Sequence, residues 1–359
     1  MIVVDGHLDL AMCALDWNRD LRLGALETRR QEAGMAQKGR GTGTVGFPEM
    51  RAGQVALSFA TAFARVAWPG SGVSGYRTQE IAYGHAMGHL AYYRQLAANG
   101  GVRLVASRAD LDRHLAEWSE PVRPGAGPEE PPLGFVVSME GADAIVSPEQ
   151  VPEWWANGLR IVSLCHYGFS AYAHGTGMPG GLLPRGRPLL RAMEEVGMIL
   201  DVSHLAEQAF YEALDAFGGP VLASHNNCRA LVPGDRQLTD EMIGLMVQRG
   251  AVIGAVMDAW MLYPNWVKGQ TSNEVVSLEN FVDHIDHVCQ VAGNARHAAI
   301  GSDLDGGYGT EQCPHDLDTI ADLQKVPDLL RRRGYAEDDV RLVMHGNWVR
   351  LLREALPAS

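Results

Sequence analysis

The sequence contains few cysteines, and they follow no regular pattern. The five cysteines are an odd number, lie far apart, and never form a C-x-x-C pair. This argues against a disulfide framework and against a cysteine-rich zinc site, because both need paired or closely spaced cysteines. Reduced thiols are the simpler interpretation, and we therefore expect a cytoplasmic protein.

Long apolar runs and blocks of basic residues are also absent. No stretch reaches the roughly 18 consecutive apolar residues that a membrane-spanning helix needs, and no basic region precedes residues 2–4 as in a secretion signal. The chain has 43 acidic and 30 basic residues, a net charge of −13, without a basic cluster that could follow a phosphate backbone. We expect neither membrane nor nucleic-acid partners.

The chain does contain alternating strand and helix patterns. Its 359 residues, 46% of them apolar, suffice for a large core. Eight short apolar runs alternate with segments of helical periodicity, as in βα units around a parallel sheet. The runs cover residues 2–9, 55–62, 133–140, 159–166, 198–204, 220–225, 251–258 and 297–303. This predicts a (β/α)₈ TIM-type barrel, rather than an open doubly wound sheet, in a single domain over residues 1–359.

Two helices between these runs have clear boundaries. Apolar residues recur at helical spacing over 278–288, after Ser277 and before Gly293, which supply start and stop signals. A second helix is expected over 239–250. The polar residues of the first helix are expected on its solvent face: Asp283, His284, Asp286 and His287.

Residues 34–46 and 121–132 are expected to be loops. Gly41, Gly43 and Gly46 satisfy the G-x-G-x-x-G pattern, but no strand precedes them and a proline follows. A dinucleotide site is therefore much less plausible than a flexible loop.

Nearly every predicted strand ends in a side chain that can bind a metal ion or carry a proton. These residues are His7, Asp9, Glu140, His166, His204, His225, Asp258 and Asp303. The carboxyl ends of parallel barrel strands meet at one mouth, so residues far apart in sequence can come together there. A lone His or Asp after a strand is more often a helix cap, but repetition at successive strands favours a shared site.

Imidazole nitrogens combined with carboxylate oxygens suit Zn²⁺ or a related first-row ion, and catalytic zinc keeps one position for water. His7 and Asp9 lie two residues apart on one strand, so they share a face and can reach the same ion. Two ions can also share a bridging carboxylate and a hydroxide.

Glu140 is the candidate bridge between two such ions. Some barrel hydrolases use a carboxylated lysine instead, which this chain cannot supply because no lysine ends a strand. Its only lysines are Lys38, Lys268 and Lys325. If there is a bridge, it must be a carboxylate side chain.

Another histidine pair is interpreted as structural. His85 and His89 lie one helical turn apart, as in zinc-protease helices. Ala86, however, occupies the position where such a helix carries its catalytic glutamate.

Several of the strand-end segments match one known family. They are DGHLD at 5–9, SMEG at 138–141, LCH at 164–166, GMILDVSH at 197–204, PVLASHNNCRAL at 220–231, LTDE at 238–241 and IGSDLDG at 300–306. The chain resembles the membrane (renal) dipeptidase family, peptidase family M19, within the metal-dependent amidohydrolase barrels. The resemblance covers nearly the whole length.

The resemblance implies a binuclear zinc centre. His7, Asp9 and Glu140 would hold one ion, and Glu140, His204 and His225 would hold the other. Glu140 and a water or hydroxide would bridge them. The implied activity is hydrolysis of small dipeptides, with L-residues or a D-residue at the C-terminal position.

The resemblance also implies roles for three further residues. His166 would assist the substrate carbonyl, and Asp303 would carry a proton from the bridging water to the leaving amine. Arg229 would bind the carboxylate of the dipeptide, for which a guanidinium fork is suited. The alternative for Arg229 is an ion pair that does not touch the substrate.

The sequence departs from the family pattern beside the expected pocket. MDAW at 257–260 stands where many family members have an aromatic residue with Asn or Tyr. LSFAT at 57–61 stands where they have a Gln-Phe-Trp-Ser type of segment. A glycine-rich and aromatic segment, 167–183, follows His166 and is expected to reshape the pocket or close over it. The mammalian members carry a leader and a lipid anchor, which are absent here, so a bacterial-type cytoplasmic enzyme is the better match.

Two alternative functions stay open. Another amidohydrolase barrel with the same metals could cleave N-acyl amino acids or cyclic amides, and a barrel with retained ligands could bind metal without catalysis. Acylating the substrate's α-amine separates a dipeptidase, which should lose activity, from an aminoacylase. The expected partners are a small dipeptide and, in a homodimer, a second copy of the chain.

Overall fold

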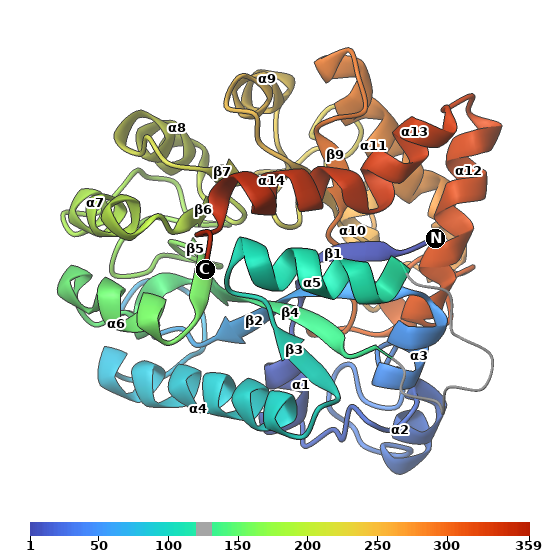
Figure 1. Ribbon diagram of the computed structural model, residues 1–359, viewed down its shortest axis with the longest axis horizontal. Helices are drawn as coiled ribbons and strands as arrows, with labels where there is room; N and C mark the ends of the chain where they lie inside the picture. The colour runs from blue at the N-terminus through green and yellow to red at the C-terminus, as the bar shows by residue number, and fades with distance from the viewer. Residues whose placement is uncertain (120–130) are drawn as a thin grey trace.

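The computed structural model describes residues 1–119 and 131–359 of the chain (Figure 1). Eight parallel strands lie side by side in the order β7-β6-β5-β4-β2-β1-β9-β8. A parallel bridge between Ala223 and Ile253 joins the two ends of this path. The predicted (β/α)₈ barrel is therefore confirmed.

The strands of the barrel are short, and a ninth strand, β3, pairs with β4 outside the ring. Their bounds are β1 Val3–Leu8, β2 Val55–Phe63, β3 Val102–Leu104, β4 Leu133–Glu140, β5 Leu159–Ser163, β6 Ile199–Asp201, β7 Val221–Leu222, β8 Ile253–Ala255 and β9 Ala298–Ile300.

Helices surround the strands, with α4, α6, α7, α8 and α9 around the rim in Figure 1 and α14 crossing in front. Their bounds are α1 Leu10–Leu15, α2 Ala25–Gln31, α3 Phe47–Ala52, α4 Gln79–Ala98, α5 Arg108–Ser119, α6 Val151–Ala156, α7 Gly186–Val196, α8 Glu207–Ala216, α9 Asp240–Gln248, α10 Ala259–Leu262, α11 Leu278–Ala292, α12 Val326–Arg332, α13 Glu337–Arg341 and α14 Asn347–Ala355.

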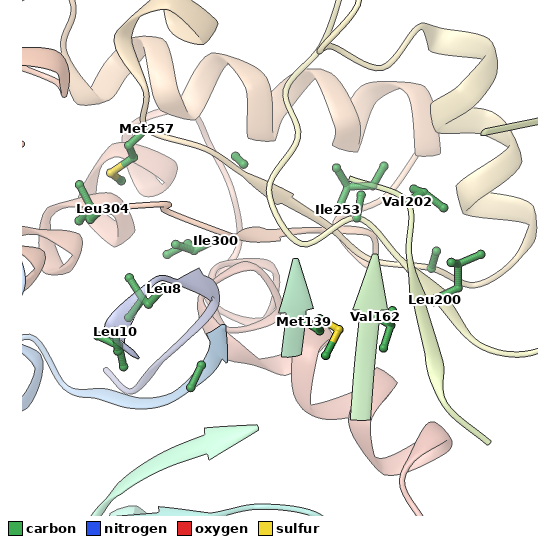
Figure 2. Packing of buried hydrophobic residues seen from close by; sticks show 14 of the residues in the cluster. Leu8, Leu10, Met139, Val162, Leu200, Val202, Ile253, Met257, Ile300 and Leu304 are labelled. Atoms are coloured by element: carbon green, nitrogen blue, oxygen red, sulfur yellow. The ribbon is translucent and has the colours of Figure 1, made fainter. Parts of the chain in front are cut away.

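Alternation along the strands separates two apolar clusters. Val136 on β4 packs with Phe59 and with Trp348 of α14, whose ring lies 4.9 Å from that of Phe59. Strand residues that face the other side of the sheet, such as Met139 on β4 and Val162 on β5, belong to the larger cluster outside the ring of strands (Figure 2). Glu140 lies four residues after Val136 on the same strand and therefore points to the same face of the sheet. Its carboxylate thus faces into the barrel at the carboxyl end of β4.

Five strands, β5 to β9, each end three residues earlier than the sequence predicted. The backbone of His204 and Asp303 adopts positive φ angles of 66° and 58°. A residue in this left-handed region cannot continue a strand, so the polar side chains after β6 and β9 lie on turns at the rim. Such strained positions cost about 1–3 kcal/mol each and concentrate at functional sites.

The two predicted helices are confirmed as α9 and α11, but one residue was placed wrongly. His284 is buried rather than solvent-facing, because its Nδ1 accepts a hydrogen bond from the Cys228 amide at 3.0 Å. The predicted loop 121–132 lies, up to residue 130, outside the described residues. Within the part of the chain that is described, no helix is long and apolar enough to cross a membrane.

Candidate active site

Seven of the predicted residues gather at the carboxyl ends of the strands. Nε2 of His7, at the end of β1, lies 3.8 Å from carboxylate oxygens of Asp9, Glu140 and Asp303. The geometry brings residues nearly 300 positions apart within reach of one ion.

A pair of histidines also contacts Glu140. Its Oε1 is 3.2 Å from Nε2 of His204 and 3.3 Å from Nε2 of His225, and these two nitrogens are 3.0 Å apart. The same Oε1 is the oxygen 3.8 Å from His7 Nε2, so all three imidazoles meet at one carboxylate oxygen. A carboxylate in this position could bridge two ions.

Unpartnered polar atoms mark the same place. His7 Nε2 and Asp9 Oδ1 are buried and have no hydrogen-bond partner. A buried polar atom without a hydrogen-bond partner destabilises the fold by about 1–3 kcal/mol. A bound ion would provide these two atoms with a partner. Zinc-type ions fit, because the atoms left over are nitrogen and oxygen ligands.

The charges of the cluster are also unbalanced. Burial raises the pKa of Glu140 to about 7, although the charge of His7 opposes this. Burial alone would lower the pKa of His7, but Glu140, Asp9 and Asp303 together raise it to about 10. Without a metal, a proton on His7 offsets part of the negative charge that cations would otherwise balance.

The remaining imidazoles are held neutral. Burial lowers the pKa of His166, His204 and His225 well below its ordinary value, and the positive charge of Arg236 adds to the effect. A neutral imidazole has one lone pair and one N–H, so the partner of one nitrogen decides what the other can do.

His225 is held in the form that binds metal. Ser224 Oγ donates its only proton to Asp201 Oδ2 at 2.6 Å, because a carboxylate can only accept. Ser224 Oγ must therefore accept from Nδ1 of His225, 2.8 Å away. The proton of His225 sits on Nδ1, which leaves the Nε2 lone pair facing Glu140.

His166 is held in the opposite form. Nη1 of Arg65 lies 2.7 Å from Nδ1 of His166, and a guanidinium can only donate. Nδ1 therefore accepts, and the ring carries its proton on Nε2, which lies 3.8 Å from Glu140 Oε2. In this form His166 can donate a hydrogen bond from Nε2 into the site.

Two adjoining cavities of about 500 and 610 Å³ open over this cluster. Both are lined by Asp9, Glu140 and His166, and the larger one also by Asp303. Their size suits a small organic substrate.

The larger cavity distinguishes two neighbouring arginines. Arg236 is buried and lines this cavity, with Nη2 donating to the His225 carbonyl at 2.8 Å and Nη1 unpartnered. Arg229 lines neither cavity and instead donates to Glu207 at 2.6 Å, although its Nη2 is also unpartnered. The structure therefore brings Arg236, and not Arg229, to the site.

The His85 and His89 pair lies with Asp16 beside the site. His89 Nδ1 accepts a hydrogen bond from the Phe63 amide at 3.3 Å, so its proton is on Nε2, which lies 2.9 Å from His85 Nε2. The same His85 nitrogen lies 3.0 Å from Asp16 Oδ1. Burial first, and then the charge of His85, lower the pKa of His89 to about 4, so the ring is neutral. The structural role of this pair stays a prediction, because ligand-type atoms of Asp16, His85 and His89 also lie within 4.8 Å of one another.

The comparisons with known proteins point to one family. A family model described as membrane dipeptidase (peptidase family M19) matches residues 1–358. The chain belongs to this family. The cluster of histidines and carboxylates described above therefore lies in a member of a metallo-dipeptidase family.

Members and relatives agree with this assignment. Dipeptidase aclJ from Aspergillus oryzae is 27% identical over 365 residues, which cover 98% of this chain and 77% of that protein. Dipeptidase tcpJ from Claviceps purpurea is 32% identical over 204 residues, or 55% of this chain. That aligned segment spans only about half of tcpJ, 45% of its length.

Solved structures of two metallo peptidases share the fold. Dipeptidase AC, a metallo peptidase, superposes with a TM-score of 0.79 at 23% identity and covers 100% of this chain and 99% of that one. A metallo peptidase from Rhodobacter sphaeroides, liganded with a phosphinate mimic of the dipeptide L-Ala-D-Ala, has a TM-score of 0.77 at 23% identity, covering 99% of both chains.

Sequence reasoning missed the residues that support the ligands. Asp201 and Asp5 each accept one hydrogen bond from an amide two residues later in the chain. Each also accepts hydrogen bonds from the amide and the hydroxyl of a serine at the neighbouring strand end, with the hydroxyl at 2.6 Å. The sequence signal was an aspartate two residues before His7 and three residues before His204. Arg65 and Arg236 gave no signal, since arginines in loops are common.

We expect Ser224→Ala to weaken metal binding about 10- to 100-fold, because His225 loses the acceptor that fixes its Nδ1 proton. The affinity can be measured by competition with a chelator. Ser277→Ala, which removes a capping hydroxyl from distant α11, is the control. Unchanged affinity in Ser224→Ala would contradict the assigned role of this serine.

Proposed function

We propose that this M19 family member is a binuclear zinc dipeptidase that hydrolyses the peptide bond of small dipeptides, either L-L or with a D-residue at the C-terminal position. The observation that carries the proposal is the group of ligand atoms around buried Glu140, at the floor of a substrate-sized cavity. The dipeptidase names of the relatives and the dipeptide mimic in the Rhodobacter structure support the same substrate class.

The metal ligands divide into two sets that share Glu140. His7 and Asp9 complete one set, and His204 and His225 complete the other. When bound, two zinc ions would lower the pKa of a shared water and polarise the scissile carbonyl, which supplies a nucleophile near neutral pH. The chain's own residues bind the substrate and move protons.

His166 donates a hydrogen bond to the oxygen of the scissile carbonyl. Its Nε2 carries the proton because Arg65 occupies Nδ1 at 2.7 Å. A donor fixed in advance stabilises the negative charge that develops on this oxygen during attack, and it does so without reorganisation. Arg65 thus acts as a positioning residue.

Asp303 carries the proton. Its carboxylate lies 3.8 Å from His7 Nε2 and lines the larger cavity. Burial first, and the nearby Asp9 and Glu140 next, raise the pKa of Asp303 well above its ordinary value, although His7 opposes this. A carboxylate of raised pKa accepts a proton from water more readily and then donates it to the leaving amine.

Arg236 binds the C-terminal carboxylate of the substrate. It is the arginine with an unpartnered buried nitrogen that lines the same cavity as Asp303. A guanidinium pairs with a carboxylate through charge-assisted hydrogen bonds. We therefore place in Arg236 the role that the family resemblance suggested for Arg229.

Asp303→Asn tests the catalytic proposal. Turnover of dipeptides should fall at least about 100-fold, because the amide cannot carry the proton, while the metal content stays at two ions per chain. Asp258→Asn is a control in the same cavity, since both Asp258 oxygens are already occupied by Gln312 and Trp260, and it should lose far less. Near wild-type turnover in Asp303→Asn would rule out this proton carrier.

Arg236→Met and Arg229→Met separate the two arginines. Arg236→Met should raise KM about 10- to 100-fold for dipeptides with a free carboxylate, but not for their C-terminal amides. Arg229→Met, which breaks the pair with Glu207 and a hydrogen bond to the Gln237 carbonyl, should change KM little. The reverse ranking would return the role to Arg229.

A further inference from the structure

Two of the three lysines of the chain lie at the larger cavity. Lys38, in the loop before α3, and Lys268, in the loop after α10, both line it together with Arg236. Lys325 lies elsewhere, where it is ion-paired with Asp322 at 2.9 Å. Scarce ammonium groups are thus concentrated at the mouth of the cavity.

The two cavity lysines are close to each other and have no carboxylate partner. Partial burial, and then the neighbouring Lys268, lower the pKa of Lys38 to about 8. Among the described residues, neither lysine forms an ion pair. Asp258 and Glu311 attract Lys38 without forming an ion pair with it, and Asp258 already accepts hydrogen bonds from Gln312 at 2.7 Å and from Trp260 at 2.8 Å. Two adjacent ammonium groups repel each other, and an anionic ligand group between them would relieve this repulsion.

The two lysines lie in the cavity where the C-terminal residue of the dipeptide is expected to bind. Arg236, the proposed site of the C-terminal carboxylate, lines the larger cavity with both lysines. Lys38 lies between the two cavities and lines both, whereas Lys268 lines only the larger one and Arg65 only the smaller one. The side chain of the C-terminal residue therefore extends into the cavity that holds Lys38 and Lys268. Trp260 and Trp266 form other parts of its lining.

We propose that the enzyme prefers dipeptides whose C-terminal residue is Asp or Glu, with the side-chain carboxylate bound between Lys38 and Lys268. This inference rests on the proposed dipeptidase function. The chain as a whole has a net charge of −13, so this preference comes from local charge and not from attraction by the whole molecule. Because the lysines are exposed at the rim, the preference should weaken as salt is added.

Steady-state kinetics on matched substrates test the inference. Ala-Asp and Ala-Glu are compared with the isosteric amides Ala-Asn and Ala-Gln, each with an L- and a D-configured second residue, at fixed low ionic strength. We expect kcat/KM about tenfold higher for the acidic member of each pair. Equal or lower values for the acidic members would overturn the inference.

Variants assign the preference to the two lysines. Lys38→Met and Lys268→Met should each reduce the acid-to-amide ratio, and Lys268→Glu should bring it below one. Lys325→Met removes the remaining lysine and should leave the ratio and the activity at wild-type values. A ratio that stays at the wild-type value in all three cavity variants would contradict the inference.

These results distinguish two failures. If no dipeptide of either charge is cleaved by metal-loaded protein, the proposed function itself is wrong. If neutral dipeptides are cleaved as efficiently as acidic ones, the dipeptidase stands and only the carboxylate preference fails.

Discussion

The site depends on a single buried carboxylate surrounded by imidazoles. Glu140 lies 3.2 and 3.3 Å from His204 and His225, and 3.8 Å from His7 and His166. Three of these four rings, His166, His204 and His225, are held neutral by burial. Burying a carboxylate is unfavourable unless positive charge compensates it. Strand β4 nevertheless brings Glu140 to the centre, so the barrel keeps an arrangement that cations stabilise. The cavity above it and the strained turns after β6 and β9 are consistent with this requirement.

Neighbouring residues give chemically identical rings different tasks. Asp201, through Ser224, places the proton of His225 on Nδ1 and frees Nε2 for a metal. Arg65 does the reverse at His166, whose Nε2 keeps its proton and can donate it to the substrate. A list of histidines near an acidic residue would not separate these two roles. The hydrogen-bond partner on the far side of each ring does.

The sequence predicted the barrel and the clustering of strand-end histidines and carboxylates because both follow repeated local patterns. His7 and Glu140 stand at the ends of apolar runs, and parallel strands bring such ends together. It did not predict Arg236, because which of two arginines in one loop enters a cavity depends on tertiary packing. The burial of His284 was missed for the same reason, since its partner, the Cys228 amide, lies 56 residues away.

Metal titration of the apoprotein tests the central claim most directly. The protein should bind two Zn²⁺ per chain, and Glu140→Gln should lose tight binding of both, because both ligand sets share this carboxylate. Elemental analysis after gel filtration gives the number of bound ions, and circular dichroism shows that the variant is folded. Zero or one ion in the wild type, or two tightly bound ions in folded Glu140→Gln, would contradict a centre built around Glu140.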